Sequence, residues 1–232
     1  MQLMGYLVVA PLLCFAHAFT DRSAAVALPP NRAKSLLPAL LVAYAVPAVS
    51  LFRPSLTPHE RQGWMTLWQV WPVTLWAASA LLARVMPADG SDLPSLRRLY
   101  AIMFVAGIAV QATLVQYVVG NTGGWEEALR VVQAVFVPEP LTATLTTPAK
   151  DLAHAAVSGL RWDFFLGMIA SLPWVVGNVW EVVDGWKAKA KIFGLVSLGF
   201  VVLGPAATTA AVSAWREEKL RDTSFARKVK KM

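Results

Sequence analysis

Six runs without Lys, Arg, Asp or Glu constrain this chain more than any other feature of its sequence. A helix needs roughly 17–25 apolar residues to cross the hydrocarbon core of a bilayer, and each run reaches that length. A spanning backbone must satisfy its own hydrogen bonds, and no run alternates like a barrel strand, so helices are expected. The runs are Met1–Thr20, Ser35–Phe52, Gln62–Ala83, Leu99–Gly120, Phe164–Trp180 and Ile192–Trp215.

The composition indicates the same class of protein. Of 232 residues, 56% are hydrophobic and 15% are charged, whereas an average soluble domain carries about 25% charged residues. We therefore expect an all-α fold: one polytopic integral membrane helical bundle over residues 1–215 and a basic tail over residues 216–232. The first run is expected to be a retained helix, because no basic residue precedes it. The Ala16-His17-Ala18 sequence leaves a cleaved signal peptide as the alternative.

The net charge of +7 is concentrated near the C-terminus rather than spread as in a nucleic-acid-binding protein. A basic tail beside a last membrane helix is typical of a cytosolic end near anionic lipid. Lys228 and Lys230 also resemble a dilysine retrieval signal, which predicts the endoplasmic reticulum. The basic residues after Trp215 are Arg216, Lys219, Arg221, Arg227, Lys228, Lys230 and Lys231.

Residues 125–150 leave the number of membrane spans open. Trp125 to Val137 is expected to form a helix whose two leading acids suit its positive end, and Pro138-Glu139-Pro140 is expected to break it. A seventh span over residues 129–148 would place more of the Lys and Arg residues on the side of the C-terminus, as the positive-inside rule favours. The polarity of that segment favours six spans instead.

Metal and thiol chemistry have little support. Cys14 is the only cysteine, and His17, His59 and His154 are far apart in the sequence. The chain therefore has no intrachain disulfide and no metal-ligand spacing, and we expect neither a metal nor a cofactor.

Asp163 directly precedes the fifth run, and its carboxyl group could have either a structural or a catalytic role. On a helix, Gly167, Ala170, Trp174 and Gly177 share its face, with about 16 Å of rise from Asp163 to Trp174. That face leaves room for an elongated apolar ligand. The structural alternatives are a helix cap, close packing of small residues, or an ion pair with Arg161 that keeps the acid ionised.

The third run carries the second candidate group. Trp68, Trp71 and Trp76 lie deeper than the tryptophans of an interface belt, so they either pack or line a cavity that stabilises a cation with ring faces. Gln69 at this depth needs a hydrogen-bond partner.

Several short motifs resemble the membrane-bound terpene cyclases of fungal meroterpenoid pathways, of the ascofuranone-cyclase type. They are Leu67-Trp68-Gln69-Val70-Trp71-Pro72, Phe136-Val137-Pro138, Trp162-Asp163 with Gly167, and the early segment containing Pro30, Asn31, Arg32, Pro38, Tyr44 and Pro47. The resemblance implies an isomerase- or lyase-type cyclisation without metal. It would begin by protonating an epoxide or alkene of a prenylated, epoxy-farnesyl-type substrate.

The residues suit that chemistry. A lone carboxyl group in apolar surroundings favours its protonated form, and tryptophan faces stabilise a carbocation without acting as bases. We expect Asp163 to be the proton donor and Trp68, Gln69, Trp71, Trp76, Trp162, Gly167, Ala170 and Trp174 to bind substrate. The alternative is a non-enzymatic membrane carrier or scaffold subunit. A retinal-type receptor is disfavoured because Ile192–Trp215 contains no lysine.

Overall fold

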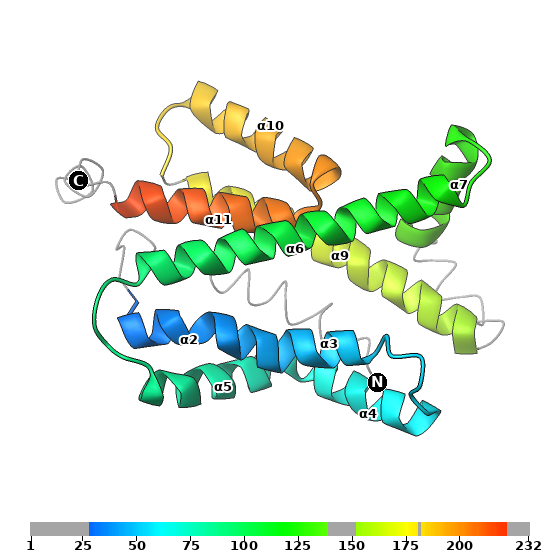
Figure 1. Cartoon of the computed structure of the whole chain (residues 1–232). Coiled ribbons are helices and arrows are strands. Elements are labelled where there is room, and N and C mark those ends of the chain that lie inside the picture. The colour runs from blue at the N-terminus through cyan, green and yellow to red at the C-terminus, as the bar shows by residue number, and fades with distance from the viewer. Residues whose placement is uncertain (1–27, 139–151, 181, 222–232) are drawn as a thin grey trace. The chain divides into compact units, whose positions relative to one another are not determined.

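The computed structural model describes residues 28–138, 152–180 and 182–221, and every regular element in these ranges is a helix (Figure 1). The predicted all-α class is therefore confirmed. The described residues fall into two compact units, 28–102 and the described part of 103–221, which are considered separately below. The elements are α2 (Pro30–Leu40), η1 (Leu41–Ala45), α3 (Val46–Ser50), α4 (Pro58–Gln69), α5 (Trp71–Val85), α6 (Leu93–Gly120), α7 (Trp125–Phe136), α9 (Leu152–Trp180), α10 (Trp186–Val202) and α11 (Pro205–Arg221).

In the N-terminal unit, α2, η1 and α3 form one helical stretch that packs along α5. Pro30 sits at the start of α2, where its missing N–H costs nothing. The buried positions of α2 are Ala33, Ser35 and Ala39, and their small side chains allow close approach to another helix. Asn31 Nδ2 donates to the carbonyl oxygen of Ala83 over 2.8 Å, which fixes α2 against α5.

The π-helical turn η1 has a local cause in the sequence. Pro47 has no N–H to donate, and in a regular α-helix its ring would clash with the carbonyl four residues earlier. The chain widens by one residue before the proline, so that the N–H of Val46 donates to the carbonyl of Leu41. Tyr44 lies inside this widened turn.

Polar contacts fix the start of α2 to the loop before α6. Lys34 Nζ donates to the carbonyl oxygens of Pro87 and Asp89 over 3.1 and 2.9 Å, and to Asp89 Oδ1 over 2.9 Å. The hydrogen bond and charge of Lys34 hold the pKa of Asp89 below its ordinary value. The backbone N–H of Leu28 donates to Oδ2 of the buried Asp92 over 2.9 Å.

The prediction of one continuous helix over Gln62–Ala83 is wrong. The run is divided between α4 and α5 at Val70, whose φ and ψ are −90° and 12°. Pro72 explains the break, because it has no backbone N–H to donate. In a continuous helix its ring would also clash with the carbonyl group of the residue four positions earlier. The chain restarts as α5 with Pro72 in its first turn, a position that tolerates proline.

The core of the C-terminal unit lies between α9, α10 and α11. One buried cluster joins Val175 and Val176 of α9 to Val196 and Phe200 of α10. A second cluster joins Val179 and Val182 to Leu220 near the end of α11. The partly buried Ile192 and Val212 pack against both clusters. The basic segment assigned to the tail thus begins inside α11, which continues to Arg221.

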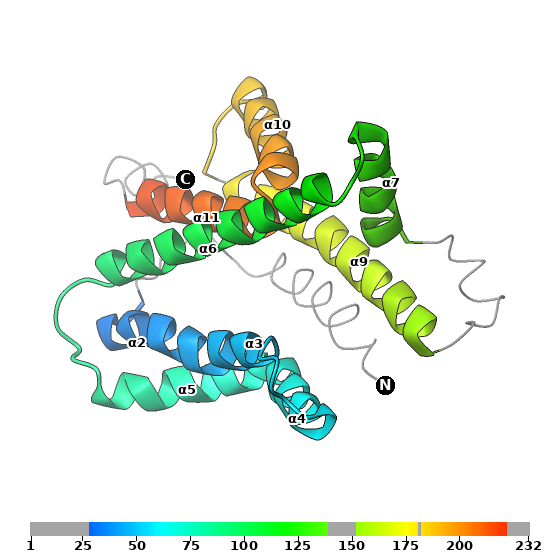
Figure 2. The ribbon, with the colours of Figure 1, turned by 45° about the vertical axis from the view of Figure 1, so that its right-hand side comes forward.

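The prediction that Ile192–Trp215 forms one spanning helix is also wrong. α10 ends at Val202, and α11 starts at Pro205 and packs back against α10 (Figures 1 and 2). Gly204 turns the chain with φ of +84°, a conformation that side-chain-bearing residues rarely adopt. The proline that follows cannot continue α10, but it suits the first turn of α11.

Two described helices are long and apolar enough to cross a membrane, Pro30–Ser50 and Leu93–Gly120, and Phe165–Trp180 is a shorter apolar segment. The predicted total of six spans is therefore not reached among the described residues, and Met1–Thr20 lies outside them. α7 ends at Phe136 before Pro138, close to the predicted boundary. The second half of the possible seventh span, residues 139–148, lies outside the described residues.

Close helix packing at Gly107 generates the first prediction. A Cβ added there would lie 2.6 Å from the backbone nitrogen of Ala207 in α11. Gly107→Ala should therefore destabilise the protein by about 1–3 kcal/mol, the usual cost of overpacking. Thermal unfolding in detergent checks this. Gly194→Ala is the matched control, since nothing lies within 4 Å of its added Cβ. Equal melting temperatures for the two variants would contradict the close contact.

Candidate functional site

Asp163 lies inside a long helix rather than at its start. α9 begins at Leu152, 11 residues earlier, which is about 16 Å along the axis. A capping side chain serves only the unpaired N–H groups of the first turn. The alternative that Asp163 caps the start of a helix is therefore wrong, because its backbone position lies in the helix interior. The side chain of Asp163 lies outside the described residues.

Arg161 occupies another face of the same helix. Positions two residues apart lie about 200° apart around a helix axis and do not face each other. This geometry disfavours the Arg161–Asp163 ion pair as a local contact. Arg161 is half-buried, and its Nε has no hydrogen-bond partner among the described residues. The neighbouring Trp162 packs edge-on against Phe165, with ring centroids 5.9 Å apart.

The predicted ligand face of α9 leads into the core of the C-terminal unit. Gly167 and Ala170 are half-buried, and Trp174 packs against the cluster containing Val175, Val176, Val196 and Phe200. Trp174 therefore contributes to core packing, in addition to the substrate-binding role predicted for it. Gly177, further along the face, has open space around it.

A compact aromatic cluster forms in the N-terminal unit. Tyr44 lies against Trp71 with ring centroids 5.4 Å apart at 76°, and against Trp68 with centroids 6.2 Å apart at 45°. The π turn carries Tyr44, and the break at Val70 separates the two tryptophans onto α4 and α5. Gln69 and Trp76 lie outside this cluster and are exposed, Trp76 at 72%.

The cluster contains a donor without an acceptor. Nε1 of Trp68 is buried and has no hydrogen-bond partner among the described residues. An unmade hydrogen bond at a buried donor costs about 1–3 kcal/mol, so such a group favours any ligand that brings an acceptor. The predicted substrate-binding tryptophans Trp68 and Trp71 thus both contact Tyr44, and the Trp68 ring carries a buried polar atom.

Tyr44 is not among the residues predicted to bind substrate, although it belongs to one of the motifs that resemble terpene cyclases. The sequence signal for Tyr44 is its position three residues before Pro47, a proline that disturbs the hydrogen bonding of the preceding helical turn. Tyr44 and Trp68 are also far apart in the chain, so no local spacing links them.

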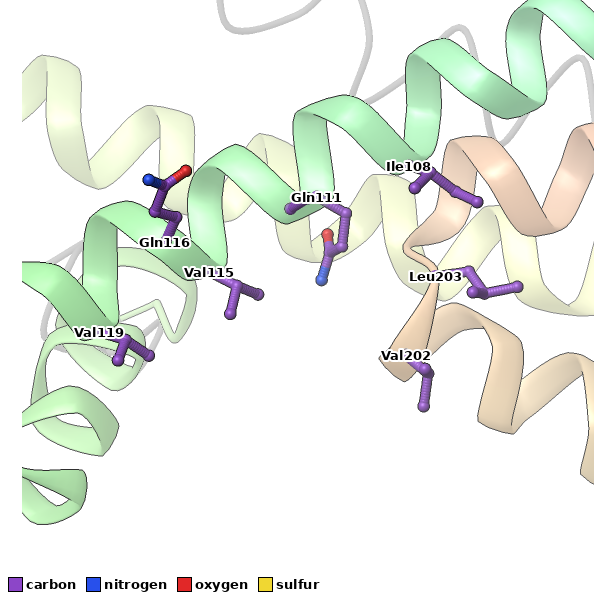
Figure 3. A pocket seen from close by; sticks show the side chains of 8 residues that line it. Ile108, Gln111, Val115, Gln116, Val119, Val202 and Leu203 are labelled. Atoms are coloured by element: carbon purple, nitrogen blue, oxygen red, sulfur yellow. The ribbon is translucent and has the colours of Figure 1, made fainter.

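An apolar groove in the C-terminal unit was not predicted at all. Its volume is about 420 Å³, within the usual range of roughly 300–1,000 Å³ for small-molecule sites. Figure 3 shows Gln111 and Val115 on the same side of α6, beside the turn that carries Val202 and Leu203. Two glutamines inside an otherwise apolar helix were the missed signal. The lining residues are Ile108, Gln111, Ala112, Val115, Gln116, Val119, Val202 and Leu203.

Each unit thus brings together part of the predicted site. The N-terminal unit gathers Trp68 and Trp71, and the C-terminal unit carries Trp162, Asp163, Gly167, Ala170 and Trp174 on one helix. Within the described residues, no group of three or more His, Cys, Asp or Glu side chains could hold a metal ion.

The fold and these features define a class: a helical protein with two described helices of membrane length, an aromatic cluster and an apolar groove. The chain belongs to the CtvD domain family, whose model matches residues 1–221. No solved structure matches the chain significantly.

Curated relatives include proteins of two kinds. The terpene cyclase ascI of Acremonium egyptiacum is 25% identical over 191 residues, and the terpene cyclase resF of Aspergillus sclerotiorum is 25% identical over 254 residues. The FAD-dependent monooxygenase verC1 of Penicillium polonicum is 26% identical over 202 residues. The resemblance to fungal terpene cyclases is confirmed at the level of distant similarity.

The chain spans only part of these relatives. The matched regions cover 76% of this chain and 48% of ascI, 100% and 65% for resF, and 82% and 23% for verC1.

The unpartnered indole nitrogen generates the second prediction. Trp68→Phe keeps a ring against Tyr44 and removes the unsatisfied donor, so the free energy of unfolding should change by less than about 1 kcal/mol. Trp68→Ala removes the ring and should cost several times more, about 3 kcal/mol. Thermal unfolding of the two variants in detergent makes the comparison. A loss above about 2 kcal/mol in Trp68→Phe would show that the nitrogen already has a partner.

Proposed function

We propose that this chain is a membrane-bound terpene cyclase that begins cyclisation of a prenyl chain by donating a proton from Asp163. The observation that carries the proposal is the position of Asp163: an acid in the interior of the 29-residue helix α9, 11 residues after its first residue and beyond the turn that a cap serves. Ionisable groups on apolar membrane helices are costly and are frequently functional. The distant similarity to two terpene cyclases supports the same reaction class.

The chemistry needs no cofactor. The proposed step requires a protonated carboxyl group, the form that apolar surroundings favour in general. Its proton passes to the oxygen of an epoxide, the carbon–oxygen bond breaks, and the resulting cation is attacked by the next double bond of the prenyl chain. Each attack forms a carbon–carbon bond and moves the cation along the chain until a proton is lost. Exclusion of water prevents early capture of the cation.

An epoxide is the starting group that the comparisons favour over an alkene. Two relatives are FAD-dependent monooxygenases, verC1 and atnA of Arthrinium sp., and this chain matches 23% of each. Flavin-dependent oxygenation of a prenyl double bond would yield the epoxide that an acid can open. We therefore propose that a flavin monooxygenase supplies the substrate, an epoxidised prenyl chain on an aromatic or other polar head.

The groove on α6 is our candidate for the prenyl chain. Its aliphatic lining suits an isoprenoid, and the amide of Gln111 can hold a polar group beside it. It lies in the same unit as α9, so both belong to one compact body.

The third prediction tests the proton donor. Asp163→Asn keeps the size of the side chain but cannot deliver a proton, so it should abolish cyclisation while leaving expression and membrane insertion intact. Asp163→Glu should keep partial activity, because only the reach of the acid changes. The assay feeds candidate epoxy-prenyl phenols to microsomes from expressing yeast and follows products by mass spectrometry.

Asp184→Asn is the matched control, since Asp184 is an exposed acid beyond the end of α9. It should retain wild-type activity. An Asp163→Asn enzyme with more than about a tenth of wild-type turnover, a loss below ~1.4 kcal/mol, would remove Asp163 from the mechanism.

The fourth prediction tests the groove. Ala112→Phe places a ring in the groove and should raise KM or block turnover. Ala109→Phe is the matched control, because Ala109 is exposed on the same helix and does not line the groove. Equal kinetics for the two variants would show that the prenyl chain binds elsewhere.

A membrane carrier or scaffold segment is the second candidate function. The match to a quarter or less of two monooxygenases favours it, because this chain could serve there as the membrane-embedded part of a longer enzyme. Such a role requires no proton donor, so Asp163→Asn would then be silent.

A further inference from the structure

We propose that α10 and α11 form a re-entrant hairpin, which enters the bilayer from one face and returns to it. The end formed by residues 182–191 and 216–221 would then rest on that face, against an anionic lipid surface. The inference depends on the membrane location in the proposed function, but not on the cyclase chemistry.

The hairpin is defined by contacts on both sides of its turn. A Cβ added at Gly199 in α10 would lie 2.9 Å from Cγ2 of Thr208 in α11, so the arms touch near the tip. Further from the tip, Val212 packs against the buried cluster that contains Val196 and Phe200 of α10 with Val175 and Val176 of α9. Figure 1 shows both arms to the left of the turn, and Figure 2 shows that they diverge from it, with α10 above and α11 running to the left.

The uncharged parts of the two arms are too short to cross a membrane. Lysines occupy the start of α10, and charged residues occupy the end of α11, which leaves Ile192–Val202 and Pro205–Trp215 as uncharged parts. Each has 11 residues and rises about 16 Å, whereas the hydrocarbon core is about 30 Å thick. The arms therefore reach about halfway and turn back.

The turn at the tip of the hairpin has its backbone buried and hydrogen-bonded within the protein. Irregular backbone at membrane depth is tolerated only where protein or a cavity surrounds it. Gly204 is buried, and its carbonyl oxygen accepts from the N–H of Thr208 over 3.1 Å and from Thr208 Oγ1 over 2.9 Å. A Cβ added at Gly204 would lie 2.9 Å from Oε1 of Gln111, a residue near the middle of the apolar run Leu99–Gly120. Contact with the middle of α6 places the tip near mid-depth.

The open end of the hairpin has the features of a membrane surface site. Trp180 and Trp186 pack edge-on with centroids 6.2 Å apart, and Lys189 Nζ lies 4.9 Å from the Trp180 ring centroid. Tryptophan and lysine are the residues that anchor helices at the interface. Lysines at the start of a helix oppose its dipole, so an external anion would offset that cost.

The α11 side of this end adds further positive charge. Arg216 Nε donates to the carbonyl oxygen of Asn178 over 2.9 Å, where the end of α9 leaves carbonyls unpaired. Leu220 is buried against Val179 and Val182, which holds the end of α11 beside the end of α9. Among the described residues, this end carries six basic and three acidic side chains: Lys187, Lys189, Lys191, Arg216, Lys219 and Arg221 against Asp184, Glu217 and Glu218. That excess suits the anionic cytosolic leaflet.

The test uses single cysteines on the two arms. In a Cys14→Ser background, Lys191→Cys and Lys219→Cys each place a thiol at an exposed position of one arm. Sealed yeast microsomes are treated with a membrane-impermeant maleimide, with and without detergent. The hairpin predicts that both cysteines are labelled in sealed microsomes. The extent of labelling without detergent should nearly equal the extent with detergent for each cysteine.

A crossing helix would place the two cysteines on opposite faces, so labelling of one only after detergent would overturn the hairpin. Labelling of both only after detergent would place this end in the lumen and overturn the anionic-lipid assignment. Carbonate extraction separates these results from a failure of the proposed membrane location. A protein released by carbonate would overturn both, whereas an integral protein with cysteines on opposite faces would overturn this inference alone.

Discussion

The missing amide hydrogen of proline, placed inside apolar helices, is the constraint on which the rest of this structure depends. An apolar helix has few other partners for a freed carbonyl, and at three prolines of this chain the backbone widens, breaks or turns, whereas α9 continues through Pro173. Pro47 widens the helix that carries Tyr44, Pro72 separates Trp68 from Trp71, and Pro205 follows the turn of the α10–α11 hairpin. The aromatic cluster and the apolar groove both lie at such interruptions.

The fold class could be predicted from the sequence, but the number of continuous helices could not. Lack of charge over a run shows that it can be buried, and that property identified Pro30–Ser50 and Leu93–Gly120 correctly. Lack of charge does not show whether the backbone continues. Gly204-Pro205 and Pro72 were visible in the sequence, yet averaging hydrophobicity over a window hides them. Treating each internal proline as a possible break would have divided both runs, but it would also have divided α9 at Pro173, where the helix continues.

Prediction of the candidate site was limited by contacts between distant segments. Trp68 and Trp71 were selected for their depth in a run, whereas their contact with Tyr44 depends on how η1 packs against α5. The supposed cap at Asp163 failed for another reason. The uncharged run begins after Asp163, but the helix begins at Leu152, because Arg161 and His154 interrupt a hydrophobic run without interrupting a helix. The start of an apolar run is thus a poor guide to the start of a helix.

We propose that the wild-type chain itself cyclises an epoxidised prenyl chain. Cyclisation is an isomerisation, so the most direct measurement incubates microsomes containing the chain with an epoxy-prenyl phenol and compares masses and retention times with vector microsomes. We expect a new compound of unchanged mass that has lost the epoxide and gained at least one ring by NMR. Recovery of unchanged substrates across a panel of prenyl lengths, with the protein stably inserted in the membrane, would contradict it.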